Sequence, residues 1–199
     1  MIHRSSAVAF SVLLGTVLAV GCKSSAPLSC VFTQATAPRN FGSVVDPRGA
    51  SVGVYRGGQP LTCGEIAFLK QQGVKTIVKL NEGGSVLDGD EARQAAAAGI
   101  VVKSFPFSAW SIGKPETCGD VKEALRFMES ESNRPVYVHC SAGRDRTGYI
   151  IGAYEELFLD EPVDAVLTEL AKYGHHGYPA LLFPQIRREL NTGSPRCGD

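Results

Sequence analysis

Apolar and polar residues alternate along this chain in a pattern that predicts strands and helices in turn. Short apolar or alternating segments, typical of β-strands, occur at residues 52–55, 74–80, 100–105 and 135–139. Helical spacing of apolar residues follows them at 62–72, 90–98, 121–131, 147–159, 162–173 and 184–191. Strands that alternate with helices of this size predict an α/β domain. We expect a central parallel-type sheet of about four to five strands with helices on both faces.

Capping patterns mark where some of these elements begin and end. Thr62 with Glu65 three residues later is a capping-box pattern, and Gly73 closes the helix that it starts. We expect Asp90 to cap the second helix in the same way. The strand at 135–139 is apolar on both faces, which indicates a buried, central position in the sheet.

The first 21 residues predict a signal peptide. Arg4 precedes an apolar stretch, residues 7–20, that is too short to span a bilayer, and small residues lead to Cys22. The sequence AVGC resembles a bacterial lipobox, whose cysteine is lipidated after cleavage, although Ala19 stands where Leu is usual. The alternative is cleavage at a small-x-small site and secretion without a lipid. Both interpretations predict an exported protein of the cell envelope or periplasm, and the lipobox predicts a lipoprotein anchored to the membrane through Cys22.

Composition sets the boundaries of the mature protein and excludes some partners. Residues 22–40 are small, polar and proline-containing and predict a tether, which leaves a domain at 41–192 and a tail at 193–199. The formal net charge is zero, so nothing in the composition indicates nucleic-acid binding. Once Cys22 and Cys140 are set aside, four cysteines remain, enough for two disulfides in an oxidising compartment. No pair has C-x-x-C spacing, so we expect no metal site.

The segment from His139 to Gly148, HCSAGRDRTG, carries the chemistry. It joins the end of a buried strand to the start of a helix, where loop N–H groups and the positive helix end attract an anion. The same surroundings lower the pKa of a thiol, so Cys140 becomes a candidate nucleophile. The planar guanidinium of Arg146 can bind two oxygens of a phosphoryl group, and the Thr147 hydroxyl can donate to the sulfur.

These ten residues resemble the H-C-x-x-G-x-x-R-[ST]-G signature of the cysteine-dependent protein tyrosine and dual-specificity phosphatases. The segment GVYRGGQP at 53–60 is similar to the N-terminal part of small atypical members of that superfamily, and the likeness covers roughly residues 40 to 190. The resemblance implies that Cys140 forms a phosphocysteine, that Arg146 binds the phosphate, and that Thr147 and His139 support the thiolate. It also implies that the loop residues bind the substrate: Ser141, Ala142, Gly143 and Arg144.

The proton donor must differ from that of most relatives, because Ala109 stands where they have an aspartate upstream of the cysteine. Three carboxylates remain, on Asp145, Asp120 and Glu116. Asp145 resembles an acid that takes part in the chemistry of a bacterial subgroup, and a carboxylate beside a bound phosphate should have a raised pKa. Asp120 instead fits a capping pattern with Thr117. We therefore favour Asp145 and keep Asp120 as the alternative.

By this resemblance the protein is expected to hydrolyse phosphate monoesters, on phosphotyrosine and also on phosphoserine or phosphothreonine, without a metal or cofactor. The expected partner is a phosphorylated protein or a small phosphorylated molecule. The loop cations Arg144 and Arg146 also fit a phosphatase of inositol phosphates or phosphoinositides. The missing upstream aspartate keeps a third reading open, a phosphate-binding module of the cell envelope that does not turn over substrate.

Overall fold

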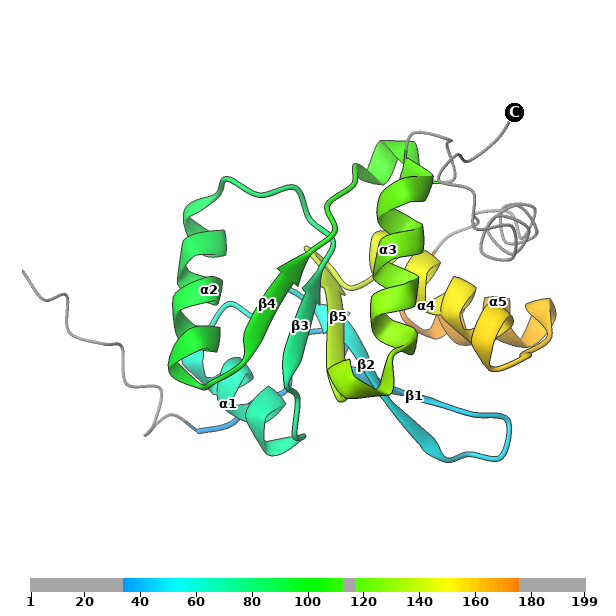
Figure 1. The fold of residues 1–199 in the computed structure, drawn as a ribbon, viewed down its shortest axis with the longest axis horizontal. Helices are drawn as coiled ribbons and strands as arrows, with labels where there is room; N and C mark the ends of the chain where they lie inside the picture. The colour runs from blue at the N-terminus through cyan, green and yellow to red at the C-terminus, as the bar shows by residue number, and fades with distance from the viewer. Residues whose placement is uncertain (1–33, 113–116, 176–199) are drawn as a thin grey trace, which may run out of the picture.

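One five-stranded sheet organises the chain in the computed structural model, which describes residues 34–112 and 117–175 (Figure 1). The strands are β1 (Gly42–Val45), β2 (Ser51–Gly58), β3 (Thr76–Lys79), β4 (Val101–Ser104) and β5 (Val136–Cys140). They are ordered β1-β2-β5-β3-β4, with β1 antiparallel to β2 and the other neighbours parallel. The predicted α/β class with a mainly parallel sheet is confirmed.

Helices cover both faces of the sheet. They are α1 (Cys63–Gln71), α2 (Val86–Ala97), α3 (Cys118–Glu129), α4 (Asp145–Phe158) and α5 (Val163–Lys172), with short 3-10 turns η2 (Ala109–Ser111) and η4 (Glu131–Asn133). Figure 1 shows α1 and α2 on one side of the sheet and α3, α4 and α5 on the other. Each side has its own apolar core. Within the described ranges, no helix has the length and apolar character needed to cross a membrane.

Strand β5 is buried on both faces, as its unbroken apolar sequence predicts. Tyr137 packs into the core beneath α1 and α2, while Val136 and Val138 pack into the core beneath α3 and α4. All five residues of the strand are buried. The loop that follows β5 therefore starts from a strand that is packed on both faces.

Two elements differ clearly from the sequence prediction. Helix α2 begins at Val86 rather than after Asp90, because the N-cap is Ser85, five residues earlier, which forms a capping box with Asp88. Strand β1 was not predicted, since it is a four-residue edge strand in which only Val44 is buried. The helix expected at 184–191 and the tail at 193–199 lie outside the described residues.

Residues 36–40, which the sequence assigns to the tether, are held against the domain. The Thr36 N–H donates to the Gly64 carbonyl at 3.1 Å, and the Gly58 N–H donates to the Arg39 carbonyl at 2.7 Å. The tether boundary at residue 40 is therefore too late. Backbone bonds to strand and helix ends decide this boundary, and such bonds leave no mark in the local composition.

The three cysteines in the described part of the chain are of two kinds. Cys140 is a free thiol, whereas Cys63 and Cys118 are both disulfide-bonded. These two residues open helices α1 and α3. Their bonding agrees with the expectation of disulfides for an exported chain.

Candidate active site

The loop after β5 lies at the edge where the four parallel strands end, and it runs directly into α4. Such a position gathers connections from several strands around one point. Gly143 is essential to its shape, because its φ of 74° is in the left-handed region. A Cβ on Gly143 would lie 2.4 Å from the Gly57 carbonyl carbon and 2.5 Å from the Gly58 nitrogen. The loop can approach β2 this closely only with glycine at 143.

The Cys140 thiol sits at the bottom of this loop with 3% of its surface exposed. Burial by itself raises the pKa of the thiol. The opposing effects are stronger: hydrogen bonds from the Thr147 hydroxyl and from the Thr147 and Gly143 N–H groups, together with the charge of Arg146, hold the pKa of Cys140 below its ordinary value. The thiolate, which is the nucleophilic form, is thereby favoured.

Thr147 is fully buried in the first turn of α4. Its hydroxyl carries one hydrogen, so it donates either to the Gly57 carbonyl, 3.4 Å away, or to the Cys140 sulfur. The hydroxyl can therefore donate to the sulfur when Cys140 is a thiolate and to the Gly57 carbonyl when the sulfur carries no charge. This placement agrees with the expectation that Thr147 supports the thiolate.

Arg146 is held at the mouth of the loop by two backbone carbonyls. Its Nη1 donates to the Leu80 oxygen at 3.4 Å and to the Phe107 oxygen at 3.2 Å, beyond the ends of β3 and β4. Both bonds use Nη1, so Nε and Nη2 carry the remaining donors for an incoming phosphate. This side gives the planar, two-oxygen contact that a phosphoryl group prefers.

Three polar side chains from outside the loop bind its successive carbonyls. The bonds run from Arg39 to Ser141 (2.8 Å), from Asn40 to Ala142 (3.0 Å) and from Arg56 to Gly143 (3.1 Å). In a trans peptide the N–H points away from the C=O, so carbonyls held on the outside turn the loop N–H groups inward. These three side chains therefore build the anion-binding face of the loop indirectly.

A buried polar network lies behind His139. The His139 Nε2 is 2.8 Å from the Glu91 Oε1, and both side chains are fully buried. The other oxygen of Glu91 accepts from Gln59 at 2.8 Å and from Lys79 at 3.3 Å. A carboxylate at this place selects the form of His139 that carries a proton on Nε2 and fixes the ring beside the nucleophile.

Opposing influences set the ionisation of Glu91. Burial raises the pKa of this carboxyl, but the hydrogen bond and charge of His139 and the charge of Lys79 outweigh burial, so the pKa lies below its usual value. Lys79 also pairs with Asp88, whose pKa is likewise held below its usual range, against burial, by Lys79 and Ser85. Glu91 and Asp88 are thus ionised at neutral pH, and both contact Lys79.

Glu91→Gln is expected to lower the free energy of unfolding by about 3 kcal/mol at pH 7, because it leaves Lys79 and His139 facing a neutral amide. The folded-state pKa of Glu91 is depressed, so its charge stabilises the fold above the unfolded-state pKa near 4.3. That contribution is lost as the pH falls towards the folded-state pKa. Urea unfolding at pH 7 and at pH 4 or below should show a difference that shrinks with acidity. The exposed Glu123→Gln is the control, and an equal loss in both variants would contradict the assignment.

The candidate acids occupy different surroundings. Asp145 is the first residue of α4, and its carboxylate lies 3.8 Å from the Nδ1 of His175. Asp120 lies in the first turn of α3, at the carboxyl edge of the sheet, and burial together with Glu123 raises its pKa. The capping pattern between Thr117 and Asp120 is wrong as a prediction, since Thr117 makes no side-chain cap.

The Thr117 hydroxyl donates instead to the Ser111 carbonyl at 2.9 Å. Glu116 lies outside the described residues. Arg144 is exposed immediately before α4. The residues that sequence reasoning missed are Arg39 and Asn40, placed in the tether, and Glu91 and Lys79, which resemble ordinary helix and strand charges. Glu91 and Lys79 could have been found from their positions, because each places a charge on a face of α2 or β3 that the sequence pattern predicts to be buried. A buried charge needs a partner.

Comparison with known proteins identifies the family. The family model "Polymorphic toxin system, DSP-PTPase phosphatase" matches residues 50–157, more than half of the chain. Dual specificity protein phosphatase TpbA of Pseudomonas aeruginosa is 28% identical over 179 residues, covering 86% of this chain and 76% of TpbA. Inositol diphosphatase DSP2 of Oryza sativa subsp. japonica is 28% identical over 123 residues, covering 60% of this chain and 55% of DSP2.

Solved structures share the fold. The catalytic core of the PP-IP phosphatase SIW14 from S. cerevisiae aligns with a TM-score of 0.62 at 22% identity, over 77% of this chain and 86% of that one. TpbA aligns with a TM-score of 0.57 at 21% identity, over 76% and 97%. Fold and site together define a phosphatase of the cysteine-dependent protein tyrosine and dual-specificity class. The chain belongs to the DSP-PTPase phosphatase family of polymorphic toxin systems.

Proposed function

We propose that this phosphatase hydrolyses phosphotyrosine in proteins through a phosphocysteine on Cys140. The observation that carries the proposal is the depressed pKa of the Cys140 thiol beneath the loop amides and Arg146. The thiolate attacks phosphorus, the S–P bond forms, and the bond from phosphorus to the leaving oxygen breaks as that oxygen takes a proton from a carboxylic acid. Water then attacks phosphorus and gives its proton to the carboxylate. The S–P bond breaks, which restores the thiolate and releases inorganic phosphate.

Charge placement supplies most of the rate enhancement in this scheme. Phosphoryl transfer spreads charge over the three oxygens that are neither attacking nor leaving. The inward loop N–H groups and the guanidinium of Arg146 point at that position, while the N-terminus of α4 adds its positive dipole end. Arg39, Asn40 and Arg56 act as positioning residues, because they hold the loop carbonyls on the outside.

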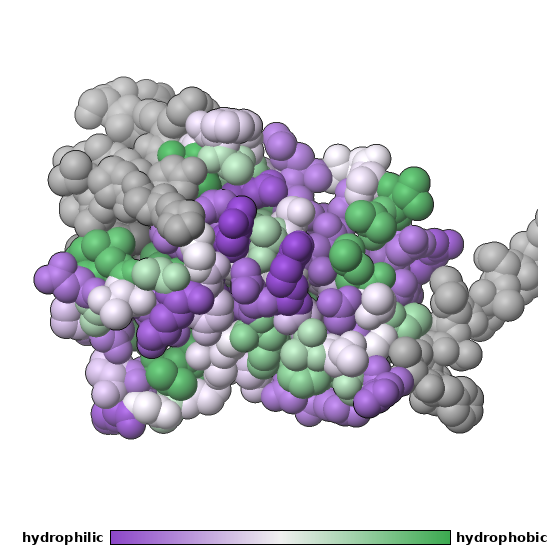
Figure 2. Space-filling view, turned by 180° about the vertical axis from the view of Figure 1, so that it is seen from behind, coloured by the Kyte–Doolittle hydropathy of each residue, from purple (hydrophilic) through white to green (hydrophobic). Residues whose placement is uncertain are grey.

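Exposed apolar residues around the site support a polypeptide substrate. Trp110 is 89% exposed and Val86 is 82% exposed, and Leu61 and Leu87 are also exposed. All four lie in or next to the connections that leave β2, β3 and β4, at the edge that carries Cys140. Figure 2 shows hydrophobic side chains in separate groups among hydrophilic ones on the face that it presents. TpbA, one of the relatives, has been solved in complex with pTyr.

The relatives also favour a second candidate, an inositol diphosphate substrate. SIW14 is described as a PP-IP phosphatase and DSP2 as an inositol diphosphatase. The exposed cations Arg39 and Arg144 beside the loop would suit a small, highly charged molecule. A panel of phosphotyrosine peptides, phosphoserine peptides and inositol diphosphates, measured as phosphate release, separates the candidates. Faster turnover of inositol diphosphates than of any peptide would replace the first proposal. Binding of the whole panel without release would indicate a phosphate-binding module.

Asp120 is our candidate for the proton donor, since its pKa is raised by burial and by Glu123, as a general acid requires. Asp120→Asn should lower kcat about 100-fold on phenyl phosphate, a poor leaving group, and much less on a fluorinated coumarin phosphate. Asp145→Asn should change both substrates by similar, smaller factors. A loss confined to phenyl phosphate in Asp145→Asn would move the role to that residue, as the sequence favours. If neither variant depends on the leaving group, both assignments fail.

Export to the cell envelope is a further part of the proposal. It is supported by the apolar segment at residues 7–20 and by the small residues before Cys22. Metabolic labelling with a radioactive fatty acid tests the anchor in the full-length chain. We expect label in the wild type and none in Cys22→Ala. Release of an unlabelled wild-type protein into the periplasm would contradict lipidation and leave export by ordinary cleavage.

A further inference from the structure

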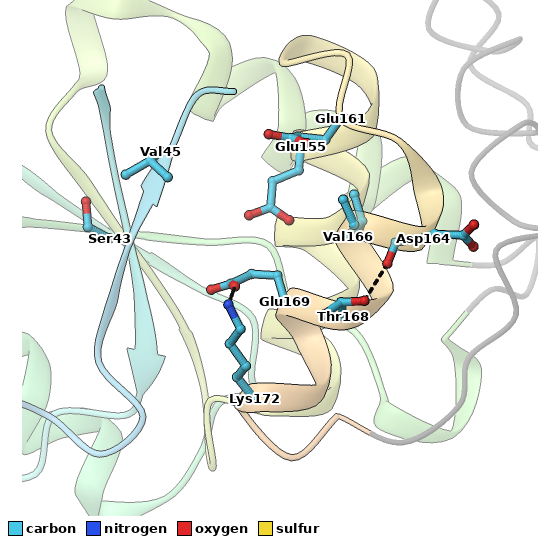
Figure 3. Close-up of a pocket in the computed structure, with 10 residues that line it drawn as sticks. Ser43, Val45, Glu155, Glu161, Asp164, Val166, Thr168, Glu169 and Lys172 are labelled. Carbon is cyan, nitrogen blue, oxygen red and sulfur yellow. Dashed lines mark hydrogen bonds and ion pairs between the residues drawn. The ribbon is translucent and has the colours of Figure 1, made fainter. Parts of the chain in front are cut away.

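A hollow lies between β1 and the helices α4 and α5, away from the loop that follows β5 (Figure 3). Its volume is about 510 Å³, within the range of small-molecule sites. Four carboxylates line it: Glu155 from α4, Glu161 from the connection that follows, and Asp164 and Glu169 from α5. Lys172 is the one cation in its lining, so the lining carries a formal excess of negative charge.

Glu155 distinguishes this hollow from an ordinary acidic surface. Its side chain is only 7% exposed, and its Oε2 has no hydrogen-bond partner among the described residues. In Figure 3 its carboxylate points from α4 into the space between β1 and α5. A buried carboxylate oxygen without a partner costs on the order of 1–3 kcal/mol, and a ligand that donates to it removes that cost.

The lining also limits the kind of cation. Among the described residues, no three His, Cys, Asp or Glu side chains come together closely enough to hold a metal ion. The carboxylates instead surround a hollow whose walls include the apolar side chains of Val45 and Val166. Separate negative groups along a partly apolar wall match several ammonium groups joined by methylene chains. A single compact ion could not reach all of them.

We propose that this hollow binds a linear aliphatic polyamine. One ammonium group donates to the Oε2 of the buried Glu155, and a second lies between Glu161 and Glu169. The methylene chain packs against Val45 and Val166. Glu169 pairs with Lys172, an exposed i,i+3 contact that costs little to exchange.

The ionisation of Glu155 gives the proposal a second readout. The pKa of this carboxyl is raised to about 7, mainly by burial, with Glu169 and Glu161 also raising it and with Arg56 from β2 and Lys172 lowering it. Lys172 at the end of α5 and Tyr173 directly after it also interact with Glu155, and Asp164 of α5 lies in the same lining. A bound cation favours the ionised carboxylate, while aliphatic ammonium groups stay protonated to about pH 10. Binding should therefore tighten from pH 6 to pH 8.

Glu155 in the hollow is linked to the loop after β5 through Arg56. Arg56 interacts electrostatically with Glu155 and is itself almost fully buried, with Nε and Nη1 unpartnered among the described residues. Its Nη2 donates to the Gly143 carbonyl. The charge state of Glu155 thus acts on the guanidinium that shapes the loop.

Calorimetric titration of the full chain with spermidine and with 1,4-diaminobutane tests the proposal, in buffer whose ionic strength is kept constant with KCl. We expect saturable binding, at least threefold tighter at pH 8 than at pH 6. Glu161→Gln combined with Glu169→Gln should weaken it at least tenfold, because both side chains are partly exposed and can change without loss of fold. Glu155→Gln should weaken binding and also remove the pH dependence. Glu123→Gln, the same change on α3 away from the hollow, should bind as the wild type does.

Three results would overturn the proposal. Equal heats for Mg²⁺ and spermidine would indicate general charge screening. Unchanged affinity in the double variant would place the binding elsewhere on the chain. Binding of an oligolysine peptide without binding of either free polyamine would indicate a basic protein partner instead. None of these measurements needs turnover, so they stand apart from the test of the phosphatase reaction.

Discussion

Replacing Cys140 by serine is expected to abolish hydrolysis of p-nitrophenyl phosphate, with a fall in kcat on the order of 10⁵-fold or more. The hydroxyl is not ionised at neutral pH. The hydrogen bonds from Thr147 and Gly143 and the charge of Arg146, which hold the pKa of the thiol below its usual value, cannot bring an alcohol into range. The wild-type reaction should run without divalent ions, should be unaffected by EDTA and should be inhibited by vanadate.

The control for this variant is to show that it still folds and still binds substrate. Cys140→Ser should keep its urea midpoint within experimental error of the wild type and should still bind a phosphotyrosine peptide in a calorimeter, because the loop amides and Arg146 remain. Substantial turnover by the serine variant would remove Cys140 as the nucleophile. Loss of both turnover and folding would require the same comparison with Cys140→Ala.

Arg146→Ala is expected to lower kcat by about 10³-fold, the effect typical of an arginine that stabilises a transferring phosphoryl group. The guanidinium is positioned by the carbonyls of Leu80 and Phe107, so its donors already lie at the mouth of the loop. Arg146→Lys should recover only part of the loss, because an ammonium group keeps the charge without the planar, two-oxygen contact.

Arg144→Ala is the matched comparison for Arg146→Ala. Arg144 belongs to the same loop and carries the same charge, but it is exposed and stands before the first turn of α4. We expect about a tenfold effect at most, mainly on KM. Single-turnover and steady-state kinetics measure both variants. Equal losses for the two arginines would mean that general positive potential, rather than a specific contact with the phosphoryl oxygens, accounts for the effect.

The sequence predicted the four parallel strands, and it did so most clearly for β3 and β5, in which every residue is buried. It failed at β1 and at the start of α2. Strand β1 has one buried residue, and the start of α2 depends on which of several polar residues caps it. Arg39 and Asn40 were missed because local sequence patterns do not reveal long-range contacts. Their side chains bind the loop from a segment about a hundred residues earlier in the chain, and composition there indicates only a linker.

The sequence by itself determined the strand, loop and helix that run from His139 to Gly148, and it singled out Cys140 and Arg146, the proposed nucleophile and phosphate-binding residue. These features are contiguous, so local geometry is enough: a buried strand end, a glycine that permits φ of 74°, and N–H groups at a helix start. Only the tertiary structure decided which distant side chains hold that loop and its histidine. Arg56 contacts the loop and Glu91 contacts His139 because the fold brings them together and because buried charges need partners. These long-range contacts produce no pattern along the sequence.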